Sequence, residues 1–324
     1  MTNPPPLPSG FKDRKIGLGI LGIFTLLAGG LCALLIPLLI FSSKAGGGAP
    51  NSQLILPAIF MYGALAVALI WLGVGSMMAR RWARALLLIF SWATLITGVL
   101  GIAAFAVMVP KFLSAIHESM PAGQPTLPAF AQQGILIMMF AVLSFLFLVL
   151  PGIWVLFYGS KNVKATCEAR DPVERWTDRC PLPVLALSLM LLFGGASILM
   201  NMVSLHGVLP FFGMLLSGPL GMAAWALFAA FWVYLAWAVY HLDLRGWWLT
   251  FLSMALFAIS SFLTYSRHNM TEVYQLAGYP QDMIARVQQI SFLQGNSLAW
   301  LTLLSFLPWL VYLLFVQKFF RRPA

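Results

Sequence analysis

The most restrictive feature of this chain is a series of long apolar runs with no charged residue near their centres. A helix needs about 20 residues to cross the roughly 30 Å hydrocarbon layer of a bilayer, and the runs reach that length. Backbone groups find no water in that layer, so each run is expected to be helical. We predict eight transmembrane helices, at 16–42, 54–78, 85–109, 134–158, 183–205, 219–241, 246–265 and 296–317.

Composition supports the membrane class and argues against a nucleic-acid partner. Of the 324 residues only 9% are charged, whereas a soluble domain carries about 25% charged residues. The net charge of +10 is spread over short clusters between the apolar runs and forms no single basic patch. We therefore predict an all-α integral membrane protein whose constant partner is the lipid bilayer.

Lysine and arginine are distributed unequally between alternate loops. If the N-terminus lies inside, four of them (Lys44, Lys111, Arg267 and Arg286) lie outside and fifteen lie inside. Loops rich in these residues stay on the cytoplasmic side, so both termini are predicted to be cytoplasmic. The expected location is a bacterial inner (plasma) membrane. The fifteen inner residues are Lys12, Arg14, Lys15, Arg80, Arg81, Arg84, Lys161, Lys164, Arg170, Arg175, Arg179, Arg245, Lys318, Arg321 and Arg322.

Two stretches of the chain, 11–30 and 176–195, share an Asp-Arg pair and a Gly-Gly pair at the same spacing. The charged pairs are predicted to mark the cytoplasmic starts of spans one and five. The glycine pairs are predicted to let helix backbones approach closely. At an offset of 165 residues, the aligned pairs are Asp13-Arg14 with Asp178-Arg179, and Gly29-Gly30 with Gly194-Gly195.

Further landmarks recur in the same order along the chain. The turn RRWAR, with Arg80, Arg81 and Arg84, precedes span three, and RGWW, with Arg245, precedes span seven. Pro151 in span four corresponds to Pro308 in span eight, and both are predicted to kink their helices. We predict a four-helix unit duplicated in tandem. Because four is an even number, the two copies are parallel and related by an axis along the membrane normal.

This repeat gives a predicted organisation in five parts. One segment, 207–218, is apolar but too short to cross, and it either extends a neighbouring helix or forms a re-entrant turn. The five parts are a disordered proline-rich cytoplasmic tail (1–15), a first repeat (16–158), a cytoplasmic linker with a short interfacial helix (159–182), a second repeat (183–317) and a basic cytoplasmic tail (318–324).

Local signals predict structure in two of the loops. In the linker, Asp171-Pro172-Val173-Glu174 has the residue types of a helix start, with Asp at the N-cap and Pro at the first helical position. It predicts a short helix that ends before Pro181 and lies along the membrane. In the external segment 271–290, Gly278-Tyr279-Pro280 is predicted to separate two short helices.

No set of residues indicates catalysis, a cofactor or a metal, and none of these is predicted. Proton and ion pathways usually carry an ionisable residue within the membrane, and no predicted span has one near its middle. Met200, Met202 and His206 include soft copper ligands, but positions two apart on a helix point to different faces. The three cysteines, Cys32, Cys167 and Cys180, form no closely spaced pair.

Three functions remain open. The leading hypothesis is a non-catalytic component that scaffolds, assembles with or modulates other membrane proteins, because the spans are uncharged and the cytoplasmic loops are short. The first alternative is a channel or facilitator for a neutral or apolar solute or lipid, since many transporters contain such repeats. The second alternative is a lipid-modifying enzyme that uses His241 and Asp243, although no nucleophile accompanies this pair.

Overall fold

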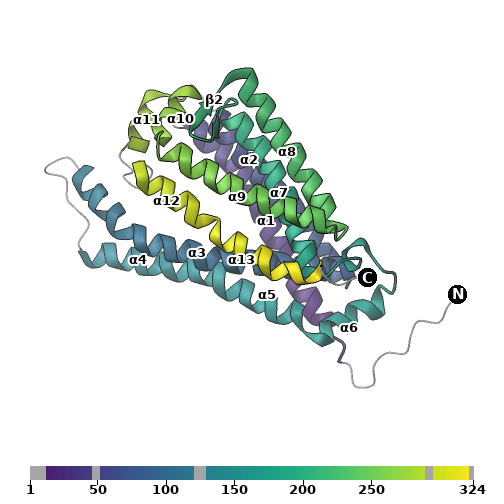
Figure 1. Cartoon of the computed structure of the whole chain (residues 1–324). Coiled ribbons are helices and arrows are strands. Elements are labelled where there is room, and N and C mark those ends of the chain that lie inside the picture. Colours follow the sequence, from purple (N-terminus) through teal and green to yellow (C-terminus); the bar gives the residue numbers. More distant parts are fainter. Residues whose placement is uncertain (1–11, 46–51, 120–128, 289–294, 321–324) are drawn as a thin grey trace. The chain divides into compact units, whose positions relative to one another are not determined.

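The computed structural model describes residues 12–45, 52–119, 129–288 and 295–320 (Figure 1). Within these ranges, eight helices are long and apolar enough to cross a membrane, which confirms the predicted all-α, multi-pass class. Residues 1–11 and 321–324 of the predicted tails lie outside the described residues. The eight candidate spans are Lys15–Ser42, Ile55–Met77, Arg81–Ala106, Gln133–Gly159, Leu182–Ser204, Gly218–Tyr240, Leu244–Tyr265 and Asn296–Phe319.

The chain divides into two compact units, each of which is described by itself. Unit 1 consists of Met1–Gly29 and Ala68–Thr177, and unit 2 consists of Gly30–Val67 and Asp178–Ala324. The boundary after Thr177 falls inside the predicted linker. The first two spans contribute residues to both units, so the units do not follow the predicted repeats in that part of the chain.

In unit 1, α3 lies alongside α4, η1 and α5 (Figure 1). The first two helices approach each other backbone to backbone, because a methyl group on Gly73 would come within 2.8 Å of the Gly22 carbonyl oxygen. Such small residues allow close helix packing in lipid. The elements of this unit come from α1 (Lys15–Ala45), α2 (Ser52–Met77), α3 (Arg81–Ser119), α4 (Ala129–Ser144), the π-helical turn η1 (Phe145–Val149), α5 (Leu150–Gly159) and α6 (Lys161–Arg170).

In unit 2, α7 and α8 pack closely through the Gly194-Gly195 pair. Gly194 lies against the Trp232 ring, and a Cβ on Gly195 would be 3.3 Å from the Ala229 carbonyl oxygen. A Cβ on Gly30, in contrast, would meet no atom within 4 Å. The further elements are α7 (Leu182–Ser204), β1 (Leu209–Phe211), β2 (Met214–Leu216), α8 (Gly218–Tyr240), α9 (Leu244–Tyr265), α10 (Met270–Leu276), α11 (Gln281–Gln288), α12 (Gly295–Ser305), α13 (Leu307–Val316) and the 3-10 turn η4 (Gln317–Phe319).

The fourth and eighth spans are both interrupted immediately before a Leu-Pro pair. Pro151 is the second residue of α5, which follows the π-helical turn η1. Pro308 is the second residue of α13, which Phe306 separates from α12. Proline has no N–H to donate to the preceding turn, so an α-helix is locally interrupted at this point.

Segment 207–218 does not extend either neighbouring helix, as one prediction supposed, but forms a two-stranded antiparallel hairpin. Phe212 and Gly213 connect the strands with φ angles of 43° and 83°. Positive φ at both central residues is the mark of a tight type I′ hairpin turn. Two hydroxyls of α9 hold this turn, since Phe212 N–H donates to Ser260 Oγ at 2.9 Å and Gly213 N–H donates to Thr264 Oγ1 at 3.0 Å.

The predicted helix that starts at Asp171 is wrong. The helix of the linker, α6, instead ends at Arg170, and it begins after Ser160, whose Oγ accepts a hydrogen bond from Val163 N–H. Asp171 is the C-cap of α6, and its carboxylate binds arginine side chains instead of the N–H groups of a following helix. The only helical turn between Asp171 and α7 is the short 3-10 turn η2 (Trp176–Asp178).

The two short helices predicted in 271–290 are confirmed as α10 and α11. Gly278 lies between them with a φ of 75°, a conformation that glycine adopts without strain. Buried apolar side chains of α10 and α11, with Tyr279, pack against Val208 beside the hairpin. The Tyr279 hydroxyl also donates a hydrogen bond to the Ser204 carbonyl at the end of α7.

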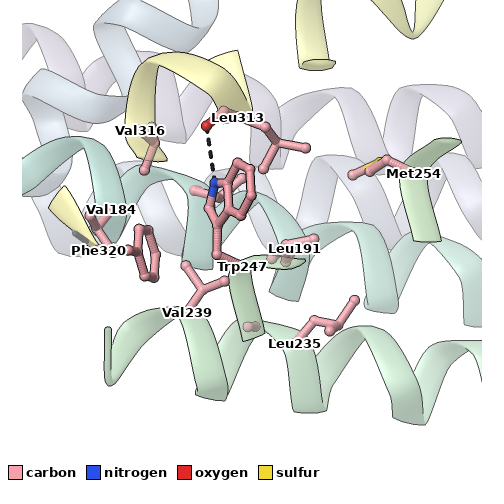
Figure 2. Close-up of a cluster of buried hydrophobic side chains, with 11 residues drawn as sticks. Val184, Leu191, Leu235, Val239, Trp247, Met254, Leu313, Val316 and Phe320 are labelled. Carbon is pink, nitrogen blue, oxygen red and sulfur yellow. Dashed lines mark hydrogen bonds between the residues drawn. The ribbon is translucent and has the colours of Figure 1, made fainter. Parts of the chain in front are cut away.

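Trp247 lies at the centre of an apolar core of unit 2 (Figure 2). Its side chain is 1% exposed, and its indole N–H donates a 3.0 Å hydrogen bond to the Leu313 carbonyl on α13. The bond therefore ties α9 to α13 within an apolar cluster. The cluster consists of Val184, Leu187, Leu191, Leu235, Ala236, Val239, Trp247, Met254, Leu313, Val316 and Phe320.

Substitution of this tryptophan provides a test of the packing. Trp247→Phe should lower the free energy of unfolding by about 1–3 kcal/mol, because it removes the buried hydrogen bond and part of the ring volume. Thermal and denaturant unfolding of the purified protein in detergent would measure the change. Trp248→Phe is the matched control, because this neighbouring ring is 53% exposed. Equal stability of the two variants would contradict the assignment.

Candidate functional site

Asp171 is the centre of an ionic cluster in unit 1. The residue is only 2% exposed, and its carboxylate lies 2.9 Å from Arg175 Nη2 and 3.6 Å from Arg80 Nη1. The Arg81 backbone N–H also donates to Asp171 Oδ2 at 3.4 Å. The residue after α6 is therefore bound to the first residues of α3. A buried carboxylate that is paired in this way has a structural role, because its partners offset the cost of removing its charge from water.

A second set of contacts binds the start of α1 to α6. Asp13 Oδ1 accepts a hydrogen bond from the Lys15 N–H, and its other oxygen forms a 2.8 Å ion pair with Arg170. The Arg14 N–H donates to Thr166 Oγ1 at 3.1 Å. The predicted charged pair thus lies at the start of the first span, where it holds a helix of the linker.

The electrostatics of the two carboxylates follow from these contacts. The hydrogen bond from Arg170 is the main cause that lowers the pKa of Asp13. Burial by itself would raise the pKa of Asp171, but the bonds from Arg175 and the Arg81 N–H, with the arginine charges, hold it below its usual value. Both groups are therefore stabilised as anions by specific cations and N–H donors.

The other predicted arginines and acids occupy separate positions. In unit 1, Arg81 forms an ion pair with Glu168 at 3.5 Å. In unit 2, Asp178 ends the turn η2, four residues before α7 begins, and Arg179 follows it on the surface. Asp243 caps α9, because its Oδ1 accepts a hydrogen bond from the Arg245 N–H at 2.9 Å.

Unit 2 contains an apolar pocket of about 310 Å³. It lies between α8, α9 and the hairpin, and almost all of its wall is hydrocarbon or aromatic ring. Among these rings, Trp232 and Phe257 meet edge to face at a centroid distance of 6.5 Å. The lining residues are Leu209, Pro210, Phe211, Phe212, Phe228, Phe231, Trp232, Leu249, Leu252, Ser253, Leu256, Phe257 and Ser260.

The wall of the pocket contains two serine hydroxyls, and each of them already makes one hydrogen bond within the protein. The Ser253 hydroxyl donates to the Thr250 carbonyl of its own helix at 2.9 Å. Ser260 Oγ accepts the Phe212 N–H of the hairpin turn. Among the described residues, no charged side chain lines the pocket. Such a wall favours an apolar ligand and gives little that would orient a polar one.

Sequence reasoning missed both of these sites. The residues of Asp171-Pro172-Val173-Glu174 fit a helix start, so the role of Asp171 as an acceptor for arginines was hidden. The signal available was an acid that follows a basic helix and lies between Arg170 and Arg175 in the sequence. The sequence signal for the pocket was two stretches rich in aromatic residues, PFFG (210–213) and FAAFW (228–232). Only the fold shows that both stretches line the same pocket.

The other residues considered for catalysis or metal binding either contact nearby backbone groups or are buried. His241 Nδ1 lies 2.9 Å from the Trp237 carbonyl at the end of α8, and Asp243 caps α9. His206 Nδ1 lies 2.9 Å from the Ala277 carbonyl. Burial raises the pKa of the thiols of Cys167 and Cys180 to about 11, so both stay protonated and poorly nucleophilic at neutral pH.

Replacement of the buried carboxylate should destabilise unit 1. We expect Asp171→Asn to lower the free energy of unfolding by about 1–3 kcal/mol. This is less than for a fully buried ion pair, because both arginines are partly exposed. The pKa of Asp171 is lower in the folded chain, so its contribution is present above the ordinary pKa of 3.8 and is lost as the pH falls below it. Unfolding measured in detergent between neutral and acidic pH would show both effects.

The matched control for this prediction is Glu174→Gln, which alters an exposed acid of the same segment. It should leave stability close to that of the wild type. If Asp171→Asn were as stable as this control, or lost stability in acid as steeply as the wild type, the structural role of the carboxylate would be refuted.

Comparison with models of protein families, with curated proteins and with solved structures finds no match to this chain. The assignment of function therefore depends on the geometry of the two units.

Proposed function

We propose that this chain is a non-catalytic multi-pass membrane protein that binds an apolar molecule, such as a lipid acyl chain, in the pocket of unit 2. The observation that carries the proposal is the aromatic and aliphatic wall formed by α8, α9 and the hairpin. Its volume of about 310 Å³ is at the lower end of the range of ligand pockets. Of the functions expected from the sequence, this geometry favours the facilitator of an apolar solute or lipid.

The composition of the wall supports a hydrocarbon chain over a polar solute. A polar ligand would lose its bonds to water in this pocket and would find only two serine hydroxyls there, each of which already makes one hydrogen bond within the protein. A hydrocarbon chain loses nothing of this kind on leaving the bilayer. It gains contacts with several rings, among them Phe231, Trp232 and Phe257.

The contacts of His241 and Asp243, the two residues considered for catalysis, support a non-catalytic role. The His241 ring binds the carbonyl at the end of α8, and the Asp243 carboxylate caps α9. Both side chains therefore have structural tasks at a helix end. Neither residue lines the apolar pocket.

We also propose that the fold arose by duplication and that both termini are cytoplasmic. The turns that follow α2 and α8 support the duplication. Both helices end with the same backbone hydrogen bonds at an offset of 163 residues, and the equivalent residues Ala79 and Leu242 have φ angles of 52° and 59°. Helices α7 and α10 also end in this way, so the motif alone is common. In these two turns, however, a new helix follows at once.

A close contact across each turn strengthens the comparison. A Cβ on Gly75 would lie 2.7 Å from the Ala83 methyl, and a Cβ on Gly246 would lie 2.6 Å from the Ala238 methyl. At the offset of 163, Gly75 corresponds to Ala238 and Ala83 to Gly246. The two turns thus use the same glycine–alanine contact with the partners exchanged, which supports a common origin.

Photochemical labelling would test the proposed pocket. Vesicles that contain the protein and a phosphatidylcholine with a diazirine near the end of one acyl chain would be irradiated and the labelled peptides mapped. We expect labelling of pocket residues on α8 and α9 to exceed labelling of lipid-facing positions. Ser253→Phe fills the pocket and should lower that labelling at least about fivefold, because a ring replaces the bound chain.

The matched control is Leu227→Phe, which adds a ring at a position on α8 that is 72% exposed and does not line the pocket. It should leave pocket labelling unchanged. Labelling of the pocket no stronger than at Leu227, or equal loss in both variants, would overturn the proposal. Recovery of the chain only in complex with another membrane protein would then favour the assembly role.

A further inference from the structure

A second hollow, of about 570 Å³, lies in unit 1 and is polar where the pocket of unit 2 is apolar. Three of its lining residues are cations: Lys15 at the start of α1, Arg80 in the turn between α2 and α3, and Arg170 at the end of α6. The rest of its lining comes from 77–79 at the end of α2. Three segments far apart in the sequence therefore bring positive charge to one place.

The acids nearby neutralise this charge only in part. Asp13 is bound to Arg170 at 2.8 Å, but Asp171 lies 3.6 Å from Arg80 and is shared with Arg175. An arginine has five N–H donors, so the Arg80 guanidinium can bind a further acceptor. Across 12–15, 80–84 and 161–175 there are ten basic and four acidic residues, which leaves this part of unit 1 strongly positive.

The hollow also adjoins an apolar surface. Met78 in its lining is 59% exposed, and Ile16, the residue after Lys15, is 81% exposed. Lys15 and Met77 are the terminal residues of two candidate spans, so the hollow lies where hydrocarbon contact gives way to polar surface. A ligand that fits both surroundings has an anionic group and a hydrocarbon chain.

We infer that this hollow binds the phosphate group of an anionic phospholipid. Arginine recognises phosphate oxygens through paired N–H donors, and lysine adds a compact charge. Basic hollows between membrane helices bind anionic lipid headgroups by this chemistry. Arg80 and Lys15 bind the phosphate, Arg170 completes the positive field, and the lipid chains lie along the exposed side chains of α1. This site is independent of the apolar pocket proposed for unit 2.

Titration of the full-length protein in detergent, followed by native mass spectrometry, tests the site. The probes are dioctanoyl-phosphatidylglycerol and, for comparison, dioctanoyl-phosphatidylcholine. Lys15→Gln breaks no ion pair described above and should weaken binding of the anionic lipid about fivefold. Lys15→Gln with Arg80→Gln should weaken it about 25-fold. The control, Lys161→Gln with Lys164→Gln, removes two charges from α6 outside the hollow and should change affinity less than twofold.

The outcomes separate the possible ligands. Preference for phosphatidylglycerol that survives millimolar inorganic phosphate, and is lost in Lys15→Gln with unchanged melting temperature, supports the lipid site. Displacement of the lipid by inorganic phosphate would assign the hollow to a soluble phosphate and overturn the lipid assignment. Equal binding of the two lipids, or an equal loss of affinity in the α6 control, would also overturn it, because charge alone would then explain the binding.

Discussion

The need to satisfy backbone hydrogen bonds without water is the constraint on which this structure depends. In lipid, each unpaired N–H or C=O group is costly, so the eight apolar runs form helices. The same constraint governs the polar side chains of the spans. Thr94, Ser197 and Asn201 donate to carbonyl groups one turn earlier in their own helices instead of to neighbouring helices. Their polarity is therefore satisfied locally.

Some of the polar contacts that join helices are fully buried. In unit 1, the Ser76 hydroxyl donates to the Leu18 carbonyl and contacts the Tyr158 hydroxyl at 2.8 Å. In unit 2, Ser188 donates to the Ala236 carbonyl, and Trp247 donates to the Leu313 carbonyl. Contacts of this kind fix which helices meet, while apolar packing and close approach at small residues fill the space between them.

Much of this fold could be predicted from the sequence, because span length and charge are properties of single segments. The eight spans and the short helices α10 and α11 follow from such local signals. Asp171 was misread because its arginine partner Arg80 lies ninety-one residues earlier. Likewise, the hairpin at 209–216 needs two hydroxyls of α9, and the crossing of α1 and α2 brings together Gly22 and Gly73, which are fifty-one residues apart. Each depends on a neighbour that only the fold supplies.

The two proposed sites would bind lipid by different chemistry. Unit 2 offers aromatic rings and almost no polar atoms, whereas unit 1 offers cations at the end of its spans. Both proposals concern binding. A binding protein of this kind holds or passes a lipid by contact and charge, with its helices as the framework.

The proposed function requires that a hydrocarbon chain occupies the pocket between α8, α9 and the hairpin. The most direct measurement is an electron cryo-microscopy map of the full-length protein in a lipid nanodisc. We expect continuous elongated density in the pocket, against the rings of Phe231, Trp232 and Phe257. A pocket closed by its own side chains, or one that holds only ordered water bound to Ser253 and Ser260, would contradict it.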